Sequence, residues 1–335
     1  MSSTKYRDSQ FVQLEQDVHA ALTPWISSYK DRSGGEFTDI GYDPNAYPEQ
    51  RLDVAYSPAK QYPRFIPGRL MLKGLEKALL RHVGSKAQLN SLVKSFRQTP
   101  ASAGSQTSIA GAAAKRLDNG EAIGVLVDHT EQGDLRDVGL VMGILILAMA
   151  NNNYRQRAAF LVGLNMSRQA YRGRTVAQEL TKAAGIIWVM QDSENRRALD
   201  IPKEGVETVN RGAFRALMEL RKQGLMLGIV PSGTAMKLVK TEAGEQLVRP
   251  EIAEGTMNIM SGLDALLPVG MHQGRIRTGP LYAIEAKGLS KRDRRLYGLG
   301  VAEMALHSLA EHNASLANLP VNYRDSHCRS ITVNP

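Results

Sequence analysis

The sequence predicts an α/β protein: a largely parallel sheet flanked by helices, preceded by an N-terminal helical region. Two observations support this fold class. From Ala122 onward, short apolar runs of strand length alternate with longer segments of helical spacing, a rhythm typical of a parallel sheet with helices on its faces. In addition, the 335 residues are 43% apolar and 22% charged, which is ordinary for a globular protein that buries a full core.

The N-terminal region is predicted to be mainly helical, with one irregular segment. Residues 11–33 are expected to form a helix, whereas residues 33–61 are rich in Gly, Pro, Asp and Tyr and show no periodicity. Apolar residues at helical spacing return at residues 72–79 and again at residues 89–96. Two consecutive helices with a break at glycine and serine between them predict a helical hairpin.

A stretch of small and polar residues, 99–111, follows the second of these helices. Such a composition predicts a linker or a mobile loop. We therefore divide the chain into an N-terminal region, residues 1–110, and an α/β domain, residues 111–335.

The α/β domain contains five apolar runs, which are its predicted strands. They lie at residues 122–127, 158–163, 186–190, 225–230 and 265–269. The helical patterns between them lie at about residues 135–150, 174–183, 206–223 and 255–262. A further strand is expected at residues 279–286 and a closing helix at residues 291–312. Functional residues collect at the carboxyl ends of parallel strands, so the residues that follow each run are the candidates for a site.

His129 and Asp134 follow the first predicted strand, with the spacing H-x-x-x-x-D. Histidine is the side chain whose ordinary pKa lies near neutrality, and a nearby carboxylate can hold one ring nitrogen and leave the other free as a base. The pair by itself is a weak signal, because an Asp that caps the following helix is also common. The rest of the chain has to decide between a catalytic pair and a helix cap.

Four predicted strand ends, in their order along the chain, resemble the motifs of the glycerolipid acyltransferase family, which contains glycerol-3-phosphate and 1-acylglycerol-3-phosphate acyltransferases. His129 and Asp134 match its first motif, H-x-x-x-x-D, and on this resemblance we predict that both are catalytic. Its second motif, a glycine and an apolar strand followed by arginine, is similar to residues 185–191; its third, F-P-E-G-T-R, to residues 230–235; its fourth, an apolar run ending in Pro-Val, to residues 266–269. The resemblance covers about residues 120–275.

The resemblance implies transfer of a fatty acyl group from a thioester, acyl-CoA or acyl carrier protein, to a hydroxyl acceptor such as glycerol-3-phosphate. The family's arginine and glutamate positions in the second and third motifs are here Gln191, Ser232 and Ala235. Neutral residues do not replace the paired donors of arginine toward a phosphate, so other cations would have to reach the acceptor. The predicted substrate-binding residues are Gln191, Arg196, Arg197, Ser232, Gly233, Thr234 and Lys237. The alternative is a non-catalytic acyltransferase-like protein that binds lipid or an acyl carrier.

The same residues give a coherent chemistry without the family. His129 would take the proton of the acceptor hydroxyl, and no Ser or Cys nucleophile is needed because the acceptor itself attacks. Backbone N–H groups at Gly233 and Thr234 would face an oxyanion or a phosphate, or the turn is a plain connection. A phosphate-binding loop is excluded because Thr234 and Ala235 stand where Lys and Ser or Thr are required. Ser232 lies outside any G-x-S-x-G motif.

Charge favours anionic partners, since the net charge is +9. Residues 138–178 contain no acidic residue, and within them we predict that Arg168, Arg172 and Arg174 hold an acidic acyl carrier protein, the phosphates of coenzyme A or anionic lipid. A solvated basic face is the other interpretation, and it is the one we favour for a second basic run at residues 287–295. No nucleic acid is expected, because the sequence lacks the aromatic interleaving typical of single-strand binders and shows no recognition motif.

Cysteine content and hydropathy predict the location. A single cysteine, Cys328, suits a reducing compartment and excludes an internal disulfide or a cysteine-based metal site. The first ten residues lack the apolar core of a secretory signal, and the longest uncharged apolar stretch, residues 138–150, is shorter than the roughly 20 residues that span a membrane. We expect a cytoplasmic protein, with peripheral contact at the inner face of a membrane, and neither metal nor cofactor.

Overall fold

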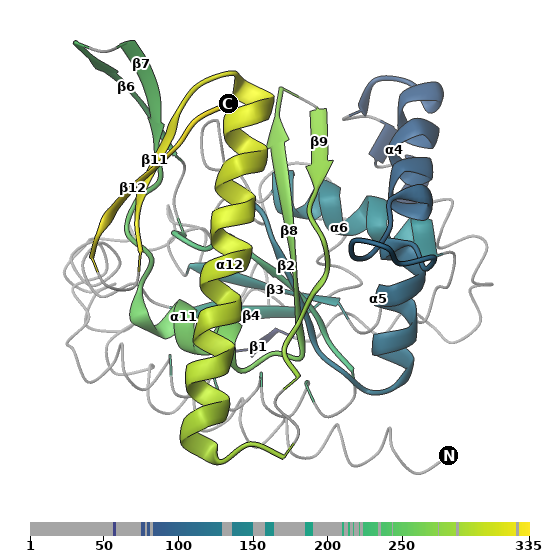
Figure 1. The fold of residues 1–335 in the computed structure, drawn as a ribbon. Helices are drawn as coiled ribbons and strands as arrows, with labels where there is room; N and C mark the ends of the chain where they lie inside the picture. Colours follow the sequence, from purple (N-terminus) through teal and green to yellow (C-terminus); the bar gives the residue numbers. More distant parts are fainter. Residues whose placement is uncertain are drawn as a thin grey trace, which may run out of the picture.

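Two sheets and the helices packed against them make up the part of the chain that the structure, a computed structural model, describes (Figure 1). The described residues are 56–57, 75–77, 79–80, 83–128, 136–149, 158–163, 185–189, 210, 214, 217, 221, 224–233, 236–242, 244–273, 275–285, 288–325 and 328–335.

The larger sheet has eight strands, five of them parallel at its centre. The parallel strands are, in spatial order, β4 (Gly185–Val189), β3 (Ala158–Gly163), β5 (Met226–Ile229), β2 (Ile123–Leu126) and β8 (Ala265–His272). Three short strands add antiparallel pairings: β1 (Tyr56–Ser57) on β4, and β9 (Arg275–Thr278) and β10 (Tyr282–Ala283) on β8. The five predicted strands are therefore confirmed, within a sheet that is mixed. The further strand expected at residues 279–286 is shorter than predicted, because among the described residues of that range only Tyr282 and Ala283 form a strand, β10.

A second, four-stranded sheet was not predicted. Its strands are, in spatial order, β12 (Ser330–Val333), β11 (Val321–Arg324), β7 (Gly244–Val248) and β6 (Lys237–Thr241). It has a small core of its own, in which Leu247 and Val321 pack with Ala310 and Ala314 of the last helix. The hairpin of β6 and β7 projects at the upper left of Figure 1.

Five helices lie within the described residues: α4 (Lys86–Gln98), α5 (Ile109–Asp118), α6 (Arg136–Met149), α11 (Glu254–Ser261) and α12 (Lys291–Ala317). The predictions at residues 89–96, 135–150, 255–262 and 291–312 are thus confirmed as helices, although α12 continues to Ala317. Helical residues also occur within 75–83 and 210–221. The helices predicted at residues 11–33 and 174–183 lie outside the described residues.

The segment predicted as a linker or mobile loop, residues 99–111, contains a closed loop followed by the start of a helix. Ile109 begins α5, where the hydroxyl of Ser108 caps the helix by accepting from the N–H of Gly111. Before it, Pro100 and Ser108 form an isolated bridge, and the N–H of Ala101 donates to the carbonyl of Thr107. Small polar residues here serve a helix cap and a closed loop. The division of the chain at residue 110 remains a prediction.

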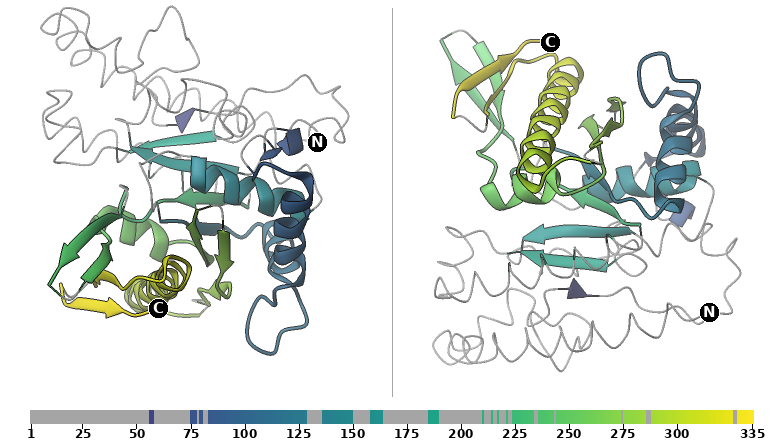
Figure 2. Two further views of the ribbon diagram at one scale, coloured as in Figure 1. Left: turned by 90° about the horizontal axis from the view of Figure 1, so that it is seen from above. Right: turned by 60° about the horizontal axis from the view of Figure 1, so that its bottom comes forward.

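Helices cover both faces of the larger sheet, as the views of Figure 2 show. A Cβ built on Gly228 of β5 would lie 2.3 Å from the sulfur of Met142 in α6. A Cβ built on Gly270 of β8 would lie 2.6 Å from the Cβ of His312 in α12. Glycine at these positions therefore lets one helix approach each face closely.

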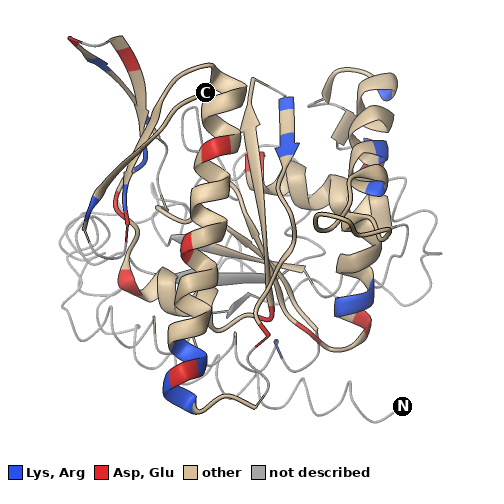
Figure 3. Cartoon of the chain, in the orientation of Figure 1, with Lys and Arg blue, Asp and Glu red and all other residues tan. Residues whose placement is uncertain are grey.

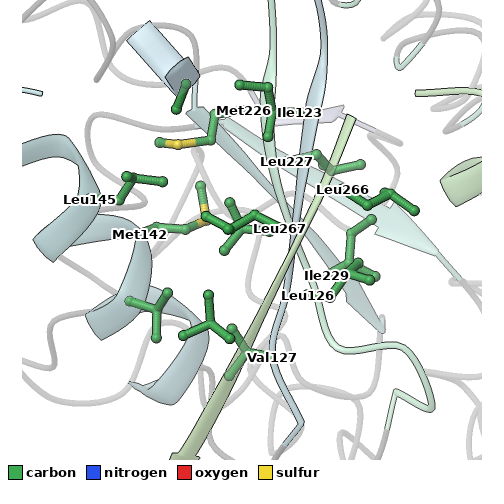
Figure 4. Packing of buried hydrophobic residues seen from close by; sticks show 14 of the residues in the cluster. Ile123, Leu126, Val127, Met142, Leu145, Met226, Leu227, Ile229, Leu266 and Leu267 are labelled. Atoms are coloured by element: carbon green, nitrogen blue, oxygen red, sulfur yellow. The ribbon is translucent and has the colours of Figure 1, made fainter. Parts of the chain in front are cut away.

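The core lies between these layers (Figure 4). Side chains of β2, β5 and β8 such as Ile123, Met226 and Leu267 are fully buried, together with Met142 and Leu145 of α6. Strands buried on both faces explain why the sequence shows continuous apolar runs there. Among the described residues, no helix is both long enough and apolar enough to cross a membrane.

Candidate functional site

The carboxyl ends of β2 and β5 lie side by side, next to the middle of β8. Leu126 of β2 is paired in register with Ile229 of β5 on one side and with Pro268 of β8 on the other. The N–H of Val127 donates to the carbonyl of Ile229 at 3.0 Å, which extends the pairing one residue further. Two of the four strand ends singled out in the sequence are therefore brought together beside Pro268, whereas β8 itself continues to His272.

Asp128 is the residue at which the described chain leaves β2, and its side chain is 1% exposed. Arg249, which follows β7, donates from Nε to Oδ2 of Asp128 at 2.7 Å, and its Nη2 lies 2.6 Å from the same oxygen. Arg249 is itself buried. An arginine and a carboxylate that are both removed from water form a strongly coupled pair, because little solvent screens them.

Two groups of α12 complete this buried cluster. Asn313 donates from Nδ2 to Oδ2 of Asp128 at 3.0 Å, and its Oδ1 accepts from the N–H of Met271 at 3.2 Å. The carbonyl of Leu306 accepts from Nη1 of Arg249 at 3.1 Å. One oxygen of Asp128 therefore takes all the donors, and Oδ1 of Asp128 has no hydrogen-bond partner in the part of the chain that the structure describes.

Aromatic and imidazole side chains extend the cluster toward the surface. The guanidinium of Arg249 lies 5.0 Å from the centre of the Tyr323 ring, and the hydroxyl of Tyr323 is 2.8 Å from Nδ1 of His307. Burial raises the pKa of Tyr323, and the nearby positive charge of Arg249 opposes that change. Nε2 of His307 is 3.6 Å from the carboxylate of Glu311, where both side chains are about half exposed.

The turn after β5 contains two of the predicted binding residues. Ser232 is buried, while Gly233 is exposed and has a φ of 67°, in the left-handed region that glycine adopts without strain. The N–H of Gly233 donates to the carbonyl of Val230 at 2.9 Å. The N–H of Gly233 is thus used inside the turn and is not free to bind an oxyanion. The second N–H proposed for this role belongs to Thr234, which lies outside the described residues. Lys237 is exposed at the start of β6.

Most of the predicted site residues lie outside the described ranges: His129, Asp134, Arg168, Arg172, Arg174, Gln191, Arg196, Arg197 and Thr234. The structure brings together the strand ends that precede several of them, and it does not test their roles. Among the described residues, no group of three or more His, Cys, Asp and Glu side chains is arranged to hold a metal ion.

Sequence reasoning missed Arg249 and Asn313 and gave Asp128 no role. Asn313 had a local signal, since it occupies a position on the apolar stripe of α12 beside Leu309 and Ala310. A polar side chain on such a stripe usually has a buried partner. Arg249 had no comparable signal, because its partner lies 121 residues away in the chain.

Comparison of the sequence with protein-family models gives no match, and comparison with curated proteins gives none either.

Proposed function

We propose that the chain is an O-acyltransferase that moves a fatty acyl group from a thioester, acyl-CoA or acyl carrier protein, to a hydroxyl acceptor. The observation that supports this most is the pairing of β2 with β5 and β8. β2 and β5 end at the segments that resemble the first and third acyltransferase motifs, and Pro268 of the fourth motif lies beside them within β8. Motifs that are far apart in the sequence would have to meet at one edge of a sheet if they formed one site.

In this proposal His129 is the general base. It takes the proton of the acceptor hydroxyl while the oxygen attacks the thioester carbonyl, and a tetrahedral intermediate forms. Collapse of the intermediate breaks the carbon–sulfur bond, and the imidazolium returns its proton to the leaving thiolate, so that a free thiol and an ester are the products. Asp134 would orient the imidazole and stabilise its charged form.

The acceptor is proposed to be a small hydroxyl compound, phosphorylated or not, of which glycerol-3-phosphate is one candidate. Gln191 and Ser232 stand where the family has arginine and glutamate, so the acceptor's charge would be met by Arg196, Arg197 or Lys237. Lys237 is exposed and begins the hairpin of β6 and β7, which follows the turn at Gly233. Its flexible stem suits a phosphate contact as a point charge, without the paired geometry of arginine.

We also propose a peripheral contact with an anionic membrane, carried by the start of α12. There the exposed apolar side chains of Leu289, Leu296 and Tyr297 lie among exposed cations, of which Lys291 and Arg292 are two. Figure 3 shows these cations grouped at the lower end of α12. Apolar side chains among basic ones are typical of surfaces that bind anionic lipid, whereas the sequence alone favoured a solvated basic face.

The test of the acyltransferase proposal is release of free thiol from acyl-CoA and from acyl carrier protein thioesters, with and without candidate acceptors. A Cys328→Ser background removes the exposed cysteine, so the protein adds no thiol of its own. We expect acceptor-dependent release, lowered roughly 100- to 10,000-fold by His129→Ala. Thioester binding without any release would favour the non-catalytic alternative, a protein that binds lipid or an acyl carrier.

A further inference from the structure

Each end of β2 is joined to the rest of the fold through an aspartate that is paired with an arginine. At the amino end, Asp264 accepts from the N–H of Ala122 at 2.8 Å, and Arg221 lies 2.5 Å from its other oxygen. At the carboxyl end, Asp128 is held by Arg249. The two pairs differ in burial: the side chains of Arg221 and Asp264 are 30% and 26% exposed, whereas those of Arg249 and Asp128 are 0% and 1% exposed.

Stability alone does not explain why the more deeply buried pair is charged. Removing two ions from water costs several kcal/mol for each ion, and an apolar pair of similar volume is often equally stable or more stable. A buried polar cluster does supply a fixed orientation, because its donors and acceptors fit in only one arrangement.

The cluster fixes Asp128 in this way. Its Oδ2 is approached by Nε and Nη2 of Arg249 and by Nδ2 of Asn313. Arg249 cannot turn freely, since its Nη1 donates to the carbonyl of Leu306 and its Cζ atom lies over the Tyr323 ring. Asn313 is fixed by Met271. The carboxylate at the end of β2 is therefore held from α12 and from the second sheet at once.

We propose that Arg249 and Asn313 are positioning residues that act through Asp128. They set the direction in which the chain leaves β2, and the next residue in the chain is His129. This inference rests on the proposed function of His129 as a base. Neither Arg249 nor Asn313 contacts the reacting atoms; their effect is on the orientation of the base, and it should appear in turnover more than in substrate binding.

The test uses the neutral double variant Asp128→Asn with Arg249→Met, because it keeps the net charge and approximate volume of the pair. The matched control is Asp264→Asn with Arg221→Met, which removes the pair at the other end of β2. For each variant, kcat and KM for thiol release are measured together with thermal unfolding. We expect the first double variant to lower kcat at least 10-fold with KM changed less than threefold, while the control leaves kcat within about twofold.

Stability separates positioning from a purely structural role. Where the first double variant unfolds at or above the wild-type temperature and kcat is still low, Arg249 positions the base. A wild-type kcat in the first double variant, at wild-type stability, would overturn the inference. An equal loss of kcat in the control double variant would also overturn it. If the first double variant does not fold, Arg249→Lys and Asn313→Asp replace it, with the same criteria for kcat and KM.

A second readout does not depend on activity. The ring signal of His129 in a histidine-labelled NMR spectrum is identified by its loss in His129→Ala. We expect this signal to move in the Asp128→Asn, Arg249→Met double variant and to stay in place in the control. If no thioester is consumed by the wild type but the signal moves, the proposed function fails and the positioning of His129 stands. An unmoved signal overturns the positioning whether or not the protein is an enzyme.

Discussion

Gly298 of α12 lies against the main chain of Ser261 at the end of α11. A Cβ built on Gly298 would be 2.3 Å from the carbonyl oxygen of Ser261, whereas one built on Gly300, two residues further along the same helix, would meet nothing within 4 Å. The two helices therefore cross at Gly298 with no room for a side chain. Backbone atoms on the α11 side cannot rotate away as the end of a side chain could.

The pair of glycines gives a prediction with its own control. Gly298→Ala should destabilise the fold by about 1–3 kcal/mol, because it forces α11 and α12 apart. Gly300→Ala should stabilise it by up to about 1 kcal/mol, since alanine is the better helix former and the site is open. Urea unfolding of both variants measures the difference. Two changes of the same sign would mean that the α11–α12 contact is looser than described.

The strands of the larger sheet were predictable from the sequence, and those of the second sheet were not. β2 and β5 are buried along their whole length, so the sequence shows an uninterrupted apolar run at each of them. β6 is mostly exposed, with Lys237, Leu238 and Lys240 all on the surface. A strand without a buried face carries little hydrophobic pattern, and its pairing depends on distant partners.

The candidate site, too, was predictable from the sequence only in part. The strand ends follow from the chain order of apolar runs, because parallel strands in one sheet end at the same edge. The Asp128–Arg249 pair depends instead on how the second sheet and α12 pack on the first, which no local pattern encodes. Sequence reasoning placed Asp128 at a strand end but gave it no role, because nothing near it in the sequence shows that the fold buries it beside Arg249.

The predicted role of the arginine-rich segment can be tested through donor binding. Reversing Arg168 and Arg172 to Glu should raise the KM for the thioester donor strongly, with a smaller effect on kcat, because a phosphate contact strengthens ground and transition states alike. Added salt should have the same effect. The control is Lys94→Glu with Lys115→Glu, which changes the charge equally at exposed positions of α4 and α5. Equal effects of both double variants would indicate a general basic surface.

The start of α12 should bind anionic vesicles. We expect flotation with phosphatidylserine-containing liposomes at low salt, lost on a high-salt wash. Lys291→Glu with Arg292→Glu should abolish flotation, whereas Lys94→Glu with Lys115→Glu should not. Leu296→Ser should weaken it at every salt concentration, because its contribution is apolar. If the wild type stays on the vesicles after the high-salt wash, insertion of apolar side chains contributes more to binding than electrostatic attraction does.

His312 should make the stability of the fold depend on pH. Its pKa is lowered from 6.5 to about 4, chiefly by burial and further by the positive charge of Arg277. Between pH of about 6.5 and about 4, this histidine is protonated in the unfolded chain but neutral in the folded chain. The free energy of unfolding therefore falls as the pH falls through this interval.

The variant His312→Gln tests this dependence. It removes the group that binds the proton and retains a polar group near the hydroxyl of Ser308, which is 3.2 Å from Nε2 of His312. Urea unfolding at a series of pH values should therefore show a stability difference between wild type and His312→Gln that shrinks or reverses over this interval and is constant above it. Arg277→Gln should raise the pKa of His312 in the folded chain, because it removes one of the two causes that lower this pKa. The pH interval over which stability changes should then be narrower at its acidic end. Parallel curves for wild type and His312→Gln across the interval would show that His312 is protonated as easily in the folded chain as in the unfolded one.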